Sequence, residues 1–213
     1  MKSTVLRTML AAVVAFTLAP DRLALGADSA EQAAIVKEKI ENLRKESAQT
    51  RNQITLTLEA LSRLTVEGVE LRPQFDKFSA ELLKMGDRAR SARARADSMR
   101  DKGESFFAEW EQHVKTIQNE DIRKEAASRV AKRKKSYNKI LSAMQDAKEE
   151  LVPFMSDLKD IRKLLDSELT TKSVNSTKKL IRQANWHGDD VKDSLTDVEK
   201  ELDRVSAELA KYQ

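Results

Sequence analysis

Apolar residues recur along this chain at alternating spacings of three and four, the pattern of helices that bury one face in a bundle or coiled coil. Four segments carry the pattern. Of their 48 seam positions 39 are apolar, whereas a chain that is 40% hydrophobic would give about 19. The pattern predicts helices over roughly residues 29–67, 74–118, 121–169 and 173–211.

Local sequence signals separate these segments. Ser29 to Gln32 has the form of a capping box for the first helix, and Gly68 and Pro73 bracket the first turn. Asp121 is a predicted cap for the third helix, and Thr170 to Ser173 marks the last turn. Connections this short make neighbouring helices antiparallel. The predicted fold is therefore all-α, an elongated antiparallel up-down-up-down bundle, or coiled coil, of four long helices.

Antiparallel hairpins also predict which residues meet. Residues of the second and third helices pair where their numbers sum to roughly 240, and those of the third and fourth near 342. The second rule sets Gly188 against Phe154. Pro153 precedes Phe154 without interrupting the seam, so we expect a kink in the third helix rather than a break. Gly188 would leave room for that irregularity.

The first 27 residues form a separate region. A short basic start precedes Thr8 to Ala19, a stretch of about a dozen uncharged residues, which is too short for a membrane span and is typical of a signal peptide. We expect cleavage near Gly26 or Ala27, which divides the chain into a signal peptide (1–27) and a helical domain (28–213). The protein would then be periplasmic or secreted, and retention of the segment as an uncleaved anchor stays open.

Composition narrows the chemistry. The chain of 213 residues has no cysteine, only five glycines and three prolines, and 39 Lys+Arg against 35 Asp+Glu. Disulfide frameworks, thiolate metal sites and cysteine nucleophiles are excluded. The predicted signal peptide holds three basic residues and one acidic residue, so its removal lowers the net charge from +4 to +2. A nearly balanced, exported chain argues against a nucleic acid partner.

No catalytic motif is present, so we expect no enzymatic activity, no cofactor and no metal. Two weaker metal hypotheses remain. Glu109 and His113 lie one helical turn apart, and His187 stands close to Asp189 and Asp190. A polar seam position and a helix irregularity around a glycine are the simpler explanations.

Two surface features are candidates for an interaction patch. The predicted seam of the second helix runs through Gly103, Phe106, Trp110 and His113, which makes Trp110 structural and leaves Phe107 beside the core. A purely structural role is the simpler explanation for Phe107 too, and Pro153 and Gly188 are also predicted to be structural. A basic run lies in the third helix. The predicted interaction patch consists of Phe107, Lys132, Arg133, Lys134 and Lys135. The basic run is suited to an anionic membrane or a cell-wall polymer, although a solvated charged face is the simpler interpretation.

A family resemblance rests on residues in the two central helices. They are Phe106, Phe107, Glu109, Trp110, Asn119, Arg123, Tyr137, Met144, Ala147 and Pro153. In order and spacing they resemble an exported bacterial coiled-coil family known as domain-of-unknown-function family 2959, over roughly residues 30–210. The family typically has a Lys-His-Asn-Leu-Asn stretch after the proline, of which Asp166 to Thr170 keeps only Leu169. The resemblance implies an extracytoplasmic helical protein and implies no activity.

Three functions remain open. The first is a non-enzymatic cell-envelope coiled-coil protein that acts through contacts with other envelope proteins, with homo-oligomers possible. The second is a periplasmic holdase-type chaperone, which needs an oligomer enclosing a cavity. The third is a helical protein that binds membrane surfaces through its amphipathic and basic faces.

Overall fold

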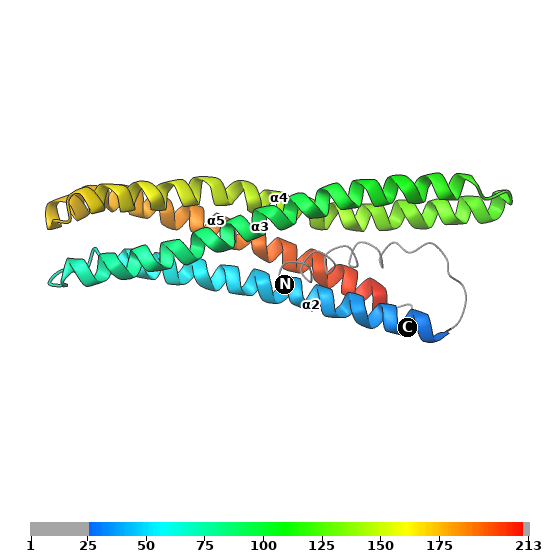
Figure 1. The fold of residues 1–213 in the computed structure, drawn as a ribbon, viewed down its shortest axis with the longest axis horizontal. Helices are drawn as coiled ribbons and strands as arrows, with labels where there is room; N and C mark the ends of the chain where they lie inside the picture. Colours follow the sequence, from blue (N-terminus) through cyan, green and yellow to red (C-terminus); the bar gives the residue numbers. More distant parts are fainter. Residues whose placement is uncertain (1–25, 211–213) are drawn as a thin grey trace, which may run out of the picture. The chain divides into compact units, whose positions relative to one another are not determined.

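The computed structural model describes residues 26–210, which form four α-helices joined by short connections (Figure 1). They are α2 (Gly26–Arg63), α3 (Leu71–Lys115), α4 (Glu120–Ser167) and α5 (Thr171–Ala210). No strand occurs within residues 26–210. The all-α prediction of four long helices is therefore confirmed. The predicted signal peptide lies outside the described residues except for Gly26 and Ala27, which begin α2.

The helix ends show how the chain turns. Gly68 has φ of 75°, a left-handed conformation that costs glycine little. Pro73 lies in the first turn of α3, where its missing N–H group has no helical acceptor to lose. This first turn was as predicted, although α3 begins a little earlier. The capping box predicted at Ser29 to Gln32 is wrong, because α2 already starts at Gly26.

Side chains cap the last two helices. Asn119 Oδ1 accepts hydrogen bonds from the backbone N–H groups of Asp121 (3.1 Å) and Ile122 (3.0 Å). Asn119 therefore caps α4, and the assignment of this role to Asp121 is wrong. Thr170 Oγ1 accepts from the Ser173 N–H at 3.2 Å, so the cap of α5 lies in the predicted turn.

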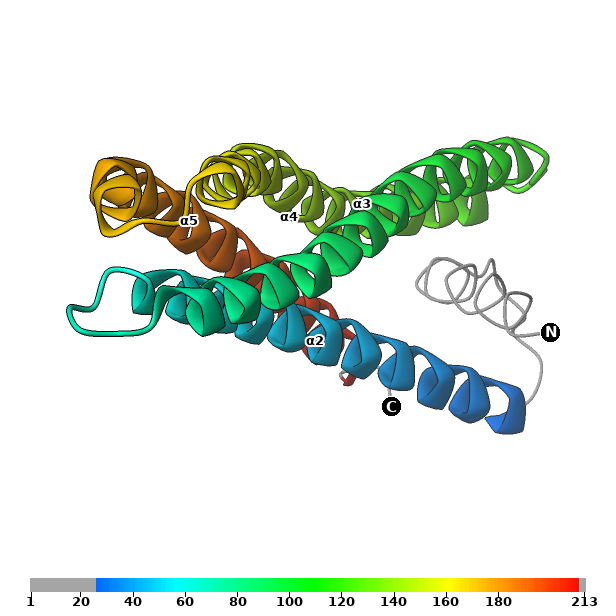
Figure 2. The same cartoon turned by 60° about the vertical axis from the view of Figure 1, so that its left-hand side comes forward.

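The helices contribute to two compact units, each described by itself. Unit 2 contains residues 46–94 and 143–197, that is, the α2–α3 and α4–α5 turns with the adjoining helix segments, visible in Figure 2. Its core is a single cluster of aliphatic and aromatic side chains. The members of this cluster with no exposed surface are Ile54, Leu61, Phe78, Met85, Phe154, Leu158, Ile161, Leu165, Ala184 and Val191. Apolar burial of this extent is the main source of stability for such a unit.

The α4–α5 register in unit 2 matches the prediction. A Cβ atom at Gly188 would lie 3.1 Å from Phe154 Cε2 and 2.8 Å from Leu58 Cδ1, so the glycine permits a close approach of helices. Helix α4 continues through Pro153, as expected for a residue that does not break the seam. Every predicted α5 seam position from Val174 to Val205 is buried.

A polar network fixes α2 against α3 in the same unit. Gln53 Nε2 donates to Glu81 Oε2 at 2.7 Å, and the fully buried Thr57 donates to the Gln53 carbonyl at 2.7 Å. Lys84 Nζ also donates to Glu81, at 2.8 Å. The hydrogen bonds from Lys84 and then Gln53 lower the pKa of the Glu81 carboxyl.

Unit 1, within the described residues, contains 26–45, 95–142 and 198–210. It includes the α3–α4 hairpin, and it also includes the start of α2 and the end of α5, which Arg44 and Asp203 join by an ion pair. In the hairpin Gly103 lies against Tyr137. Their numbers sum to 240, so the predicted α3–α4 register is confirmed.

Candidate interaction surface

An aromatic cluster holds the α3–α4 hairpin together. Phe107, Trp110 and Tyr137 are 1%, 7% and 5% exposed, respectively. The Phe107 ring stacks on Trp110 with centroids 6.5 Å apart and is tilted against Tyr137 at 5.3 Å. Aromatic pairs of this kind add about 0.5–1.5 kcal/mol beyond their area burial. The cluster therefore makes the first half of α4 a firm platform on α3.

Phe107 is a core residue, so its assignment to a surface patch is wrong. The predicted seam placed Phe106 and His113 inside, whereas Phe107 and Val114 are buried and His113 is exposed. The cause is the spacing of the buried residues: Met99, Gly103 and Phe107 follow one another at intervals of four residues instead of alternating intervals of three and four. The buried face of α3 is therefore rotated by part of a turn relative to the predicted seam. Trp110 keeps its predicted structural role because it belongs to both registers.

The close approach at Gly103 depends on the absence of a side chain. A Cβ atom there would overlap the hydroxyl and ring of Tyr137, whose O–H donates to the Met99 carbonyl. Burial raises the pKa of Tyr137 to about 12, and the negative charges of Glu104 and Asp101 act in the same direction. The phenol therefore stays protonated and serves as a hydrogen-bond donor across the hairpin.

Two members of the basic run turn toward α3. The Arg133 guanidinium lies 5.6 Å from the centroid of the Trp110 ring. Lys134 lies 5.7 Å from the Phe107 ring and forms a salt bridge with Glu111 at 2.6 Å. Arg133 and Lys134 therefore contribute to the contact between α4 and α3 through cation–π and ionic interactions.

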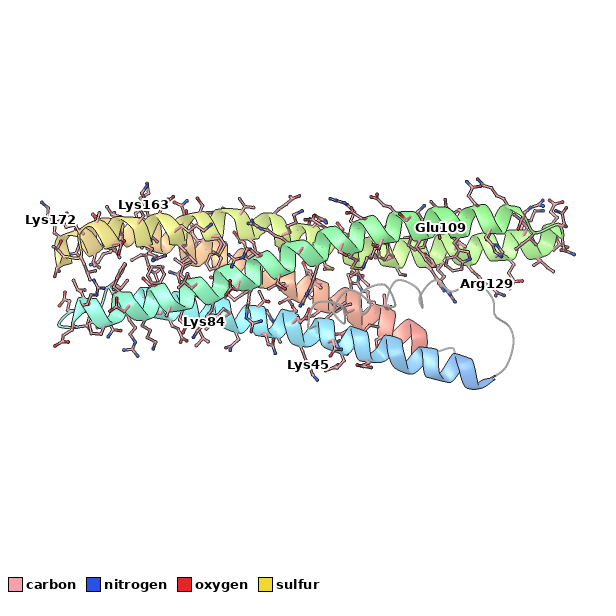
Figure 3. The ribbon with its side chains drawn as sticks, in the orientation of Figure 1. Lys45, Lys84, Glu109, Arg129, Lys163 and Lys172 are labelled. Atoms are coloured by element: carbon pink, nitrogen blue, oxygen red, sulfur yellow. The ribbon has the colours of Figure 1, made fainter. Side chains whose placement is uncertain are left out.

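The other lysines form an outward stripe. Lys132, Lys135 and Lys139 are exposed, and their spacings of three and four residues place them on one face of α4, here called the lysine stripe. Within residues 26–210 no carboxylate forms an ion pair with any of the three. Between residues 120 and 142, α4 carries eight Lys+Arg against three Asp+Glu. Figure 3 shows how side chains such as Arg129 project from this hairpin.

A shallow groove of about 520 Å³ runs beside the stripe. Its lining includes Lys134, Lys135 and Lys139, the polar Asn138 and Ser142, and the single carboxylate Glu111. Because Glu111 is paired with Lys134, the groove keeps a positive character. Sequence analysis missed Lys139 because it lies outside the continuous basic run. The heptad position it shares with Lys132 was the available signal.

The polar run around Gly188 lies in unit 2. His187 Nδ1 is 2.8 Å from Asp157 Oδ2 on α4, while Asp189 pairs with Lys192 at 2.6 Å. His187 and Asp189 therefore have different partners. Nowhere in the described residues do three His, Asp or Glu side chains gather as a metal site would require, and Glu109 and His113 are both exposed.

Trp186 is the residue of this run that sequence analysis did not single out. Its side chain is 72% exposed, the highest value among the large apolar residues that the structure describes. Trp186 does not belong to the core cluster of its own unit.

A comparison with known protein families gives a match over the whole helical region. The model of the family described as "Protein of unknown function (DUF2959)" matches residues 27–210. The chain belongs to this family. The family resemblance drawn from the α3 and α4 residues is thus confirmed. No curated protein and no solved structure matches the chain.

The DUF2959 description assigns no activity, so the evidence on function lies in the surfaces of the chain. None of the helices in residues 26–210 is long and apolar enough to cross a lipid bilayer. Of the predicted interaction patch, Lys132 and Lys135 lie on an outward face, while Arg133 and Lys134 contact α3 and Phe107 is buried. The lysine stripe is therefore the candidate interaction surface.

Proposed function

We propose that this protein is a non-enzymatic protein of the cell envelope that acts through contacts with other proteins, using the lysine stripe as a contact surface. The observation that carries the proposal is the alignment of Lys132, Lys135 and Lys139 on one exposed face. Because the aromatic cluster fixes α4 on α3, the charges are displayed in a defined geometry. A partner with acidic side chains at helical spacing would fit it.

In-cell photo-crosslinking tests this proposal. A photoreactive residue at Lys135 is compared with one at Lys163, an exposed lysine in the other half of α4. We expect discrete protein adducts from position 135 that are weak or absent at 163. Equal adduct patterns at the two positions, or none at position 135, would contradict a stripe-dependent contact.

Export is a separate part of the proposal and has its own test. The support is the basic start followed by the uncharged stretch up to Ala19. We expect the protein in the envelope fraction, with an N-terminus near residue 27 or 28 by mass spectrometry. An intact Met1 in the cytoplasmic fraction would overturn it.

A membrane surface is the second candidate, because a row of lysines also attracts anionic lipid. Surface helices that insert into lipid also carry large apolar residues, and α4 exposes none between Arg123 and Leu151. Co-sedimentation with phosphatidylglycerol vesicles at low salt decides between the two. Binding that requires the lysine stripe would favour the lipid surface.

A further inference from the structure

A second charged stripe lies on α5. Asp190, Asp193 and Asp197 are exposed, and their spacings of three and four residues place them on one face. Trp186 lies one helical turn before Asp190 on the same face. This set of four residues, here called the Trp–Asp stripe, lies opposite the buried α5 seam. In the described part of the chain, Asp190 and Asp193 form no ion pair, while Asp189 next to them is taken by Lys192.

The two stripes match in length and sign. Three lysines on α4 and three aspartates on α5 each follow the order i, i+3, i+7, so each row covers about 10 Å along its helix. Aligned side by side, Asp190 and Asp193, which form no ion pair within the described residues, can each face one lysine of the stripe, and Asp197 extends the acidic row. The positive excess on the first half of α4 thus has its counterpart on the same molecule, in keeping with the near balance of 39 basic and 35 acidic residues.

Trp186 adds a contribution to binding that charged side chains alone do not give. Exposed ion pairs are individually weak and are screened by salt, so a short row of them holds a complex poorly. Tryptophan is enriched among the residues that dominate binding energy, and its ring face also attracts cations. An indole that is 72% exposed at the end of an acidic row therefore provides an anchor.

We propose that the lysine stripe of one copy binds the Trp–Asp stripe of a second copy of this chain. The inference rests on the proposed function, since it names the partner of the same lysine stripe. The association is expected to depend on protein concentration and to weaken with salt, because most of the contact is ionic.

Paired charge reversal tests the proposal. The first variant combines Lys132→Glu, Lys135→Glu and Lys139→Glu, so both of its stripes are negative. The second combines Asp190→Lys, Asp193→Lys and Asp197→Lys, so both are positive. Circular dichroism checks that each variant is folded. In sedimentation velocity at about 50 mM salt we expect the wild type to self-associate and each variant alone to be monomeric. An equimolar mixture should associate again, because opposite stripes are restored in both directions.

Matched controls separate the stripe from net charge. Lys159→Glu, Lys163→Glu and Lys172→Glu change the charge by the same amount at exposed sites in unit 2, two of which are labelled in Figure 3. We expect this control to associate like the wild type. Trp186→Ala, which changes no charge, should weaken association about tenfold.

Several outcomes would overturn the inference. They are a wild type that stays monomeric at low salt, a mixture of the two variants that stays monomeric, and a control variant that dissociates like the stripe variants. If the wild type is monomeric but adducts at position 135 persist with other proteins, self-recognition fails and the proposed function stands. If neither self-association nor protein adducts at position 135 are found, and the protein binds vesicles through the lysine stripe, the lipid surface is the partner.

Discussion

The two halves of α4 have the same apolar spacing but different surroundings. In residues 143–167, which belong to unit 2, Leu151, Phe154 and Leu158 are at most 1% exposed. In residues 120–142, which belong to unit 1, only three apolar side chains reach burial, namely Val130, Tyr137 and Ile140. The charges differ as well, with four basic and six acidic residues in the second half against eight and three in the first. A single helix thus contributes a core at one end and displays positive charge at the other.

Matched isoleucines give the largest expected contrast between these halves. Ile161 is fully buried and Ile140 is 5% exposed. Ile161→Ala should cost about 4 kcal/mol of unfolding free energy and Ile140→Ala about 2 kcal/mol, because the better-packed site leaves the larger cavity. Urea unfolding followed by circular dichroism measures both. Val152→Ala, at a site 54% exposed, is the control and should change stability by less than about 0.5 kcal/mol. Equal costs at the two isoleucines would remove the contrast.

Glycine substitutions sharpen the comparison at the points of closest approach. In Gly103→Ala the new methyl group overlaps Tyr137, which must move and lose its bond to the Met99 carbonyl, so we expect a loss of about 2 kcal/mol. In Gly188→Ala the nearest atom is the flexible end of Leu58, and the gain in helix propensity of up to about 1 kcal/mol offsets most of the clash.

Gly86→Ala serves as the control for both substitutions, because its Cβ atom would meet only ordinary contacts at 3.8 and 3.9 Å. We expect it to be neutral or slightly stabilising. A Gly103→Ala variant as stable as Gly86→Ala in thermal or urea unfolding would contradict the close approach of Gly103 and Tyr137.

These sites also show what the sequence could predict. The α5 seam was predicted fully because its three-four alternation continues unbroken from Val174 to Val205. In α3 two four-residue steps in succession shift the buried face, and a strict heptad therefore misplaced Phe106, Phe107 and His113. The sequence analysis grouped Lys132 and Lys135 with Arg133 and Lys134 and missed Lys139, although the spacings of three and four residues were the available signal for one outward face. The contacts of Arg133 and Lys134 depend on aromatic side chains of the neighbouring helix, which no local pattern reveals.

Alkaline titration tests how firmly the first half of α4 is held. The chain has two tyrosines, so in a Tyr212→Phe background Tyr137 is the only phenol. Its pKa of about 12 lies above the ordinary value of 10 because the folded state favours the neutral form. That contribution to stability is complete below pH 10 and is lost as the pH rises from 10 through 12. Absorbance at 295 nm follows the ionisation, and a midpoint near 10 in the folded protein would show that the phenol is not held between the helices.

The smallest expected effect concerns the lysine stripe. Neutralising it with Lys132→Gln, Lys135→Gln and Lys139→Gln should leave stability unchanged or raise it by up to about 0.5 kcal/mol. The spacings of three and four residues bring like charges together on the helix surface, and each such pair costs a few tenths of a kcal/mol. Lys134→Gln is the contrasting variant, because it removes the salt bridge to Glu111 and the contact with Phe107, and it should lose about 0.5–1 kcal/mol. Thermal unfolding at low salt distinguishes the effect of the triple variant from that of Lys134→Gln. A loss above about 1 kcal/mol in the triple variant would mean that the outward lysines support the fold. A neutral result means that the fold does not need the three lysines, and a stabilising result means that their mutual repulsion opposes the fold, so in either case the free chain gives them no stabilising role.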